Sequence, residues 1–108
     1  MENKTRFVGM LGFAMRAGKV LIGCDLVCRA LPKSGDGRVE LVMVCAEASD
    51  STKKKITTKC AFYNTDLIEI PLTLEELGHL LGKTYGPAVV AIRDSGFARE
   101  LKAAYGDR

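Results

Sequence analysis

The sequence contains little of what several common binding chemistries require. It has no tryptophan, one histidine and only four phenylalanines and three tyrosines in 108 residues. Because proteins hold unpaired bases by stacking them on aromatic rings, so few rings argue against base stacking across an open sheet. The longest apolar runs, such as AVVAI at residues 88–92, are far too short to cross a bilayer. Neither GxxxxGK[ST] nor GxGxxG occurs, so the familiar phosphate-binding loops are absent.

The four cysteines do not form a recognisable metal or disulfide pattern. Cys24, Cys28, Cys45 and Cys60 lie at apolar or helical positions, which is typical of reduced core thiols. Cys24 and Cys28 stand four residues apart in an expected helix and would share a face. A tetrahedral metal site needs a second pair of ligands, and the only histidine is His79. We therefore predict structural thiols and neither a metal nor another cofactor.

Candidates for catalysis are equally few. Glu47 and Asp94 are carboxylates in expected loops, and His79 lies on a short amphipathic helix, where we expect it to be structural and partly buried. None of the three has a recognisable catalytic partner. We predict that the protein is not an enzyme.

The length and composition favour one small domain over residues 1–108. A hydrophobic content of 47% is enough to build a core without disulfides or metals. The N-terminal MENKTRFVGM lacks the apolar segment of a secretory signal. We expect a cytoplasmic protein with no membrane partner.

Apolar periodicity, turn residues and capping residues predict nine elements in which helices alternate with strands. The expected helices cover residues 5–17, 25–31, a lysine-rich segment after Ser49, 73–82 and 97–105, and the expected strands cover 20–22, 39–46, 66–70 and 88–92. Residues 39–46 are almost continuously apolar, as in a central strand that is covered on both faces. This order implies an α/β fold with helices on both faces of a small mixed sheet.

The positive charge is concentrated in the first part of the chain. Residues 1–60 contain eleven Lys/Arg against six Asp/Glu, whereas residues 61–108 contain five against seven. This asymmetry suggests one basic face, for which nucleic acid is the commonest partner and solvent the alternative.

A turn at Gly23 is the first candidate binding site. The glycine allows a tight connection between a short strand and a helix, and the first amide groups of that helix have no intrahelical partners. They can meet an anionic or polar ligand, with Lys19 and Arg29 on either side of the turn. An ordinary strand-to-helix connection is an equally open interpretation.

Two further loops complete the predicted site. Lys53 and Lys54 follow Ser49 at the start of a helix, where cations oppose the helix dipole unless phosphate or another anion offsets them; a solvated lysine run is the alternative. Asp94, Ser95 and Gly96 follow a buried strand. If the strands are parallel neighbours, the Gly23, Ser49 and Asp94 loops share one end of the sheet, where ligands gather in open α/β sheets.

Several segments together resemble the kink-turn-binding ribosomal proteins. They are GFAMRAGK at residues 12–19, GCDLVCRA at 23–30, LVMVCAEASDSTKKKITTKCAFYN at 41–64, ELGHLLGK at 76–83 and VVAIRDSGFA at 89–98. The family groups archaeal large-subunit protein seven with eukaryotic protein thirty. The sequence is most similar to its bacterial YlxQ-like branch, over about residues 6–104. The resemblance implies a three-layer α/β/α sandwich with about four strands, which grips kink-turn RNA through a strand-to-helix turn.

The family signature maps onto residues 23–29 only in part. It reads glycine, a variable residue, Asn or Lys, Glu or Gln, two variable residues and Lys. Gly23 and Arg29 match its ends, and Cys24 occupies the first variable position. Asp25 replaces the amide or lysine, and Leu26 replaces the residue that reads base edges of the tandem G·A pairs. Each lost bidentate base contact lowers specific affinity by about 1–3 kcal/mol. Asp25 has two open roles, which are to accept from guanine N–H groups or to pair with Arg29.

The resemblance places the remaining RNA contacts in residues 49–54, 83–86 and 93–96, so that Lys83 joins the candidate site and Tyr85 is the aromatic residue most free to meet a base. We predict a monomeric RNA-binding protein of the translation apparatus, with the ribosome or a translation factor as a further partner. The alternative is a ribosome-associated or protein-interaction module that has lost specific kink-turn recognition, as Leu26 suggests.

Overall fold

The computed structural model describes residues 2–70, 72–83 and 86–106. The elements follow in the order α1 (Glu2–Arg16), β1 (Val20–Ile22), α2 (Cys24–Ala30), β2 (Leu41–Cys45), α3 (Asp50–Phe62), β3 (Asp66–Ile70), α4 (Leu74–Leu80), β4 (Val89–Ile92) and α5 (Ser95–Gly106). The predicted order is confirmed. At most ends of these helices and strands, the predicted boundary differs from the observed one by a few residues. Tyr85, expected to be free to meet a base, lies outside the described residues.

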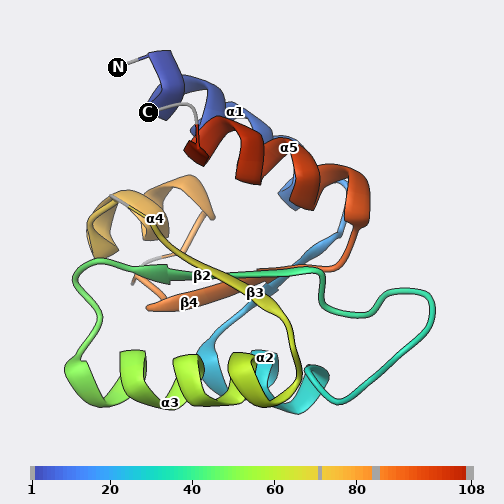
Figure 1. The fold of residues 1–108 in the computed structure, drawn as a ribbon. Helices are drawn as coiled ribbons and strands as arrows, with labels where there is room; N and C mark the ends of the chain where they lie inside the picture. Colours follow the sequence, from blue (N-terminus) through green and yellow to red (C-terminus); the bar gives the residue numbers. More distant parts are fainter. Residues whose placement is uncertain (1, 71, 84–85, 107–108) are drawn as a thin grey trace.

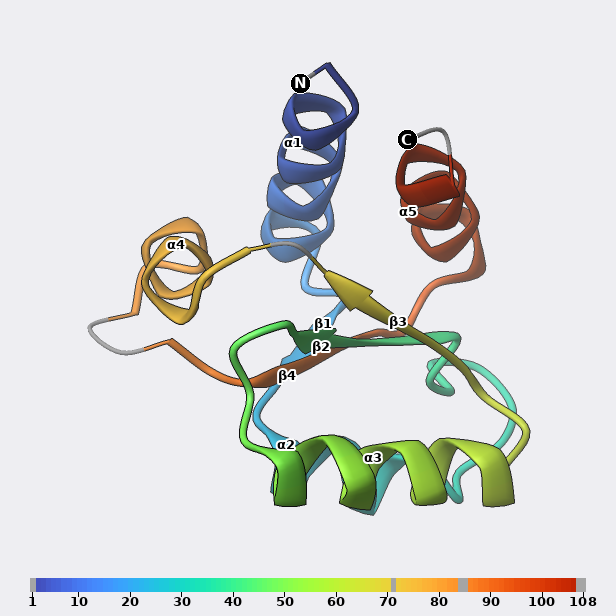
Figure 2. The ribbon, with the colours of Figure 1, turned by 60° about the vertical axis from the view of Figure 1, so that its left-hand side comes forward.

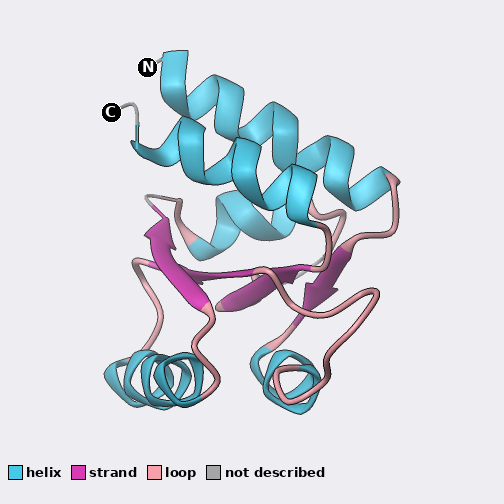
Figure 3. Cartoon of the chain, turned by 45° about the vertical axis from the view of Figure 1, so that its right-hand side comes forward, coloured by secondary structure: helices cyan, strands magenta, loops and turns pink. Residues whose placement is uncertain are grey.

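The predicted three-layer α/β/α sandwich is confirmed. Helices α2 and α3 cover one face of the sheet, and α1, α4 and α5 lie on the other (Figures 1 and 3). Helices α1 and α5 pack against each other, which brings the two termini together, whereas α4 stands apart from them (Figure 2).

The four strands are ordered β1-β4-β2-β3. Strands β2 and β3 are parallel, with Leu41 opposite Asp66, whereas β4 is antiparallel to both of its neighbours, β2 and β1. Every residue of β2 and of β4 is buried, as the apolar run at residues 39–46 predicted. The alternation of helices and strands along the chain thus produces a mixed sheet, and its two central strands, β2 and β4, form the middle of the core.

Local signals correctly predicted the beginnings of two helices. The Ser49 hydroxyl accepts a hydrogen bond from the Thr52 amide at 3.2 Å and thereby caps α3. Thr73 and Glu76 form a reciprocal capping box at the start of α4, at 3.0 Å and 2.9 Å. Such caps satisfy amide groups that have no partner within the helix.

Three large side chains lie exposed on the helices. Phe13 of α1 and Phe62 of α3 are 55% and 78% exposed. Phe13 is covered on one side by the Arg16 guanidinium, which lies 4.9 Å from the ring centre. His79, expected to be partly buried, is exposed. These residues lie on helix flanks that the neighbouring layer does not reach, which a helical pattern alone does not disclose.

Candidate nucleic-acid interface

Strand direction decides which loops can form one site. Strands β1, β2 and β3 point the same way, so that Gly23 and Ser49, which follow β1 and β2, lie at one end of the sheet. We call this the Gly23 end. Strand β4 runs in the opposite direction, so that Asp94 lies at the other end, which we call the Asp94 end (Figure 1).

The prediction that the three loops share one end is therefore wrong in part. Four predicted site residues lie away from the Gly23 end: Lys19, Asp94, Ser95 and Gly96. The Lys19 carbonyl accepts a hydrogen bond from the Arg93 amide at 2.8 Å, which fixes the start of β1 beside the end of β4. The Asp94 carboxylate accepts from the Phe97 amide at 2.9 Å and stabilises the first turn of α5.

Gly23 forms the tight strand-to-helix turn that the sequence predicted. Its φ of 107° is unfavourable for residues with a Cβ, although no atom lies within 4 Å of the place where a Cβ would stand. The Gly23 amide donates to the Val89 carbonyl at 2.9 Å, and the Gly23 carbonyl accepts from the Val27 amide at 3.0 Å. The first bond attaches the beginning of α2 to the beginning of β4, and the second closes the first turn of α2.

Asp25 pairs with a residue that the sequence did not suggest. Its carboxylate lies 3.6 Å from the Lys55 ammonium group, so the ion pair joins α2 to α3 rather than linking Asp25 to Arg29. Asp25 is 87% exposed, so that its second oxygen is open to a ligand. Arg29 is exposed in the last turn of α2, about 9 Å along the helix axis from Gly23.

Two of the three consecutive lysines of α3 are offset by carboxylates from other elements. Lys55 pairs with Asp25, and the Lys53 ammonium lies 3.8 Å from Glu69 of β3. Lys54 is exposed and has no ion pair among the residues that the structure describes. The expected conflict with the helix dipole is thus partly relieved within the protein. Of the three consecutive lysines, Lys54 is therefore the one most available to an external anion.

The segment before β4 also belongs to the Gly23 end. The Glu47 carboxylate accepts a hydrogen bond from the Leu74 amide at 2.8 Å and holds the start of α4 beside the loop that precedes α3. Gly86 lies against the Leu74 carbonyl, where no Cβ would fit. Lys83 is exposed between α4 and this contact. Glu47, a candidate catalytic carboxylate in the sequence, instead connects two segments 27 residues apart.

Three thiols lie together behind this surface. Cys24 and Cys28 share a face of α2, and each contributes to raising the pKa of Cys60 on α3, where burial is the main cause. Burial also raises the pKa of Cys24, with Cys28 as the second cause. All four cysteines are free thiols, and the described residues hold no group of three side chains that could bind a metal ion. Because a protonated thiol is a weak nucleophile, the raised pKa values of Cys24 and Cys60 suit packing better than reaction.

The pKa of Cys60 predicts a measurable pH dependence of stability. Burial raises this pKa from 9.0 to about 11, so that the unfolded thiol ionises before the folded one. The protonated Cys60 thiol therefore contributes to the free energy of unfolding in full below pH 9, and this contribution is lost as the pH rises through about 11. In urea unfolding at pH 8 and pH 10.5, the midpoint should fall further for the natural protein than for Cys60→Ala. Lysine titration affects both proteins alike, so equal falls would contradict the assignment.

Comparisons with known proteins agree with this architecture. The model of the ribosomal protein L7Ae/L30e/S12e/Gadd45 family matches residues 6–102. RNA-binding protein YlxQ of Bacillus subtilis is 38% identical over 95 residues, which cover 85% of this chain and 87% of that protein. Large ribosomal subunit protein eL30 of Methanosarcina mazei is 30% identical over 90 residues, covering 83% and 81%.

Two solved structures show the same fold. A Bacillus halodurans protein with unknown function superposes with a TM-score of 0.83 at 32% identity, covering 94% of this chain and 97% of that one. The 15.5kD RNA binding protein of Giardia lamblia superposes with a TM-score of 0.75 at 14% identity, covering 99% and 88%. No helix among residues 2–70, 72–83 and 86–106 combines the length and apolar character of a membrane span.

Proposed function

The chain belongs to the ribosomal protein L7Ae/L30e/S12e/Gadd45 family, and from this premise we propose that it binds structured RNA at the Gly23 end of its sheet. The family membership and the relatives named as RNA-binding proteins support RNA as the ligand. We place this activity in the translation apparatus and in the cytoplasm. In this proposal the protein acts as a monomer and catalyses no reaction.

The meeting of three segments at the Gly23 end carries the proposal. The Gly23 turn, the start of α3 and the segment around Lys83 approach from different parts of the sequence, and the Asp25–Lys55 and Glu47–Leu74 contacts connect them. Such a rigid, basic surface suits the phosphates of a bent RNA, which fix the register of a complex. Lys54, Arg29 and Lys83 are its exposed cations that form no ion pair within the described residues, whereas the exposed Lys55 pairs with Asp25.

Within this surface we assign different roles to the predicted residues. Lys53 and Lys54 contribute phosphate contacts, and Ser49 holds their helix in place. Gly23 and Cys24 form the turn that approaches the RNA, and the exposed oxygen of Asp25 accepts from a base. Kink-turn RNA is the proposed target, because the turn and Arg29 retain the two ends of the family signature.

The Lys54→Ala variant tests the phosphate contacts. We expect it to weaken binding to a labelled kink-turn RNA and to lower the salt slope of log K by about 1, because one ion contact is lost. Titrations at two salt concentrations measure both effects. Lys59→Ala is the matched control, since Lys59 lies in the last turn of the same helix. An equal loss in both variants would contradict a localised site.

Specificity requires a comparison of RNAs. Binding should favour the kink-turn RNA over a straight duplex of equal charge, and Arg29→Ala should abolish that preference. Weak binding of equal affinity to both RNAs, lost at the higher salt concentration, would contradict kink-turn recognition. Binding to neither RNA would overturn RNA binding itself.

The exposure of Leu26 favours one alternative function. An apolar side chain that is 42% exposed at the tip of the candidate surface suits a protein contact better than a base contact. In that case the chain is a ribosome-associated accessory module. Its association with purified ribosomal particles should then survive Lys54→Ala and Arg29→Ala but weaken in Leu26→Ser.

A further inference from the structure

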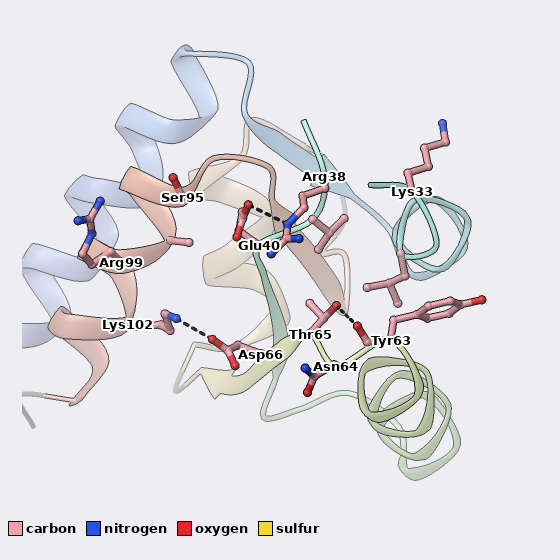
Figure 4. Close-up of a pocket in the computed structure, with 13 residues that line it drawn as sticks. Lys33, Arg38, Glu40, Tyr63, Asn64, Thr65, Asp66, Ser95, Arg99 and Lys102 are labelled. Atoms are coloured by element: carbon pink, nitrogen blue, oxygen red, sulfur yellow. Dashed lines mark hydrogen bonds and ion pairs between the residues drawn. The ribbon is translucent and has the colours of Figure 1, made fainter. Parts of the chain in front are cut away.

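A groove lies at the Asp94 end, far from the Gly23 turn. Its volume is about 480 Å³, and it is bounded by the end of α2, the segment before β2, the connection from α3 to β3, and α5. In Figure 4, Arg99 and Lys102 of α5 lie on one side of this groove and Lys33 and Tyr63 on the other. We call it the Asp94-end groove. It can therefore receive a ligand that spans the two helical layers.

The charges of this groove favour an anionic ligand. Four cations line it against two carboxylates. Each carboxylate already has a partner, because Arg38 lies 3.1 Å from Glu40 and Lys102 lies 2.6 Å from Asp66. The remaining two cations, Lys33 and Arg99, are exposed and have no ion pair in the described part of the chain. They stand on opposite sides of the groove (Figure 4), which suits an extended ligand with more than one anionic group better than one compact anion.

An aromatic pair distinguishes the groove from a purely electrostatic surface. Tyr63 lines the groove, and its ring packs edge-on against that of Phe62, with centroids 4.8 Å apart and planes at 85°. Phe62 is 78% exposed, more than Phe13 and Leu26, the other exposed large apolar side chains of the described residues. Phe62 thus has a largely free ring held by Tyr63, a neighbouring ring that itself lines the groove. Such an exposed ring next to a groove with two available cations can stack an unpaired base.

We propose that the Asp94-end groove binds a single-stranded segment of RNA, with phosphates at Lys33 and Arg99 and a base stacked on Phe62. A duplex keeps its bases stacked within the helix, so Phe62 selects an unpaired strand. The inference deepens the proposed function and rests on it, since the strand is one that flanks the structured RNA held at the Gly23 end. The two sites lie at opposite ends of β2 and β4, so each can be tested separately.

Titration of a labelled ten-residue oligouridylate tests the charged contacts. The double variant Lys33→Gln/Arg99→Gln should lower the salt slope of log K by about 1.4, because each of the two lost phosphate contacts on a single strand contributes about 0.7. It should leave the affinity for a kink-turn RNA without single-stranded ends unchanged. Lys54→Ala should have the opposite pattern, and Lys59→Gln serves as the charge control for both. Thermal unfolding confirms that each surface variant remains folded.

The stacking contact has its own test. Phe62→Ala should weaken oligouridylate binding by about tenfold without changing the salt slope, and Phe62→Tyr, which keeps the ring, should bind as the natural protein does.

The same titrations show which results overturn the proposal. If oligouridylate binds no better to the natural protein than to the double variant, the groove is not an RNA site, whereas retained kink-turn binding leaves the proposed function intact. If oligoglutamate of equal charge binds as tightly and Phe62→Ala changes neither ligand, the groove recognises charge alone and the assignment to RNA is wrong. Loss of kink-turn binding in the natural protein, with oligouridylate still bound at the groove, would instead overturn the function proposed for the Gly23 end.

Discussion

Replacing Leu26 by glutamate is expected to raise the preference for kink-turn RNA over a straight duplex by about 5- to 150-fold, which corresponds to about 1–3 kcal/mol. The reason is that the resemblance to the kink-turn-binding proteins implies a residue that hydrogen-bonds base edges at this position, whereas the Leu26 side chain has no hydrogen-bonding group. The natural protein would then hold RNA mainly through phosphates, and the variant would add a base contact. Competition titrations with the two RNAs at one salt concentration measure the preference.

The position tolerates this change structurally. Leu26 is 42% exposed, so that a polar side chain there loses little buried contact. It also lies in the first turn of α2, where a negative charge interacts favourably with the helix dipole. Leu26→Met, which changes shape without adding an acceptor, is the matched control. An unchanged preference in the glutamate variant would show that this part of α2 does not face the bases.

Ile56→Ala is expected to cost about 2–5 kcal/mol of unfolding free energy, the largest loss among the substitutions considered, because the side chain is completely buried. For a domain of this length, such a loss lowers Tm on the order of 10–20 °C. Only Ile56 and Cys60 are buried among the residues of α3. The substitution therefore truncates one of the two buried side chains of the lysine-bearing helix.

Thermal unfolding and RNA binding should respond together to this change. Thr57→Ala, at an exposed neighbouring position of α3, should shift Tm little and leave binding unchanged. Ile56→Ala should weaken RNA binding even below its Tm, since Lys53 and Lys54 would no longer be held in one geometry. Native-like affinity in a strongly destabilised Ile56→Ala protein would mean that the lysines act without a fixed helix.

The helices and strands could be predicted because their signals are local. The apolar run of β2, the Ser49 cap and the capping box at Thr73 all act within a few residues of the element they define. Gly23 likewise predicted a tight turn, whose backbone conformation would be strained in a residue with a Cβ. Such short-range preferences do not depend on what packs against them.

The direction of β4 could not be predicted in the same way, and it decided which loops form the site. A parallel β4 would require the chain to cross back over the sheet after β3. Helix α4 has seven residues and is about 10 Å long, whereas a five-residue strand spans about 16 Å. In the structure the chain stays at the Gly23 end and enters β4 from there. The helix expected at residues 73–82 would be about 15 Å long, so its expected length did not signal this direction.

Contacts between distant segments account for the remaining differences. The Asp25–Lys55 pair, the Glu47–Leu74 hydrogen bond and the gathering of Lys33 with Arg99 at one groove depend on how the layers pack. Their partners are 27 or more residues apart in sequence. No local pattern encodes such pairs, and the basic face expected from composition is divided between two ends of the sheet.

The outermost strands of the sheet have a consequence for self-association. One border is β1, which has only three residues, and the other is β3, which carries the exposed charges Asp66 and Glu69. Lys102 and Lys53 hold these carboxylates beside the strand. A foreign strand that added to either border would gain few backbone hydrogen bonds or would have to bury charge. The two edge strands thus protect the sheet against edge-to-edge pairing with other chains, which leads to aggregation.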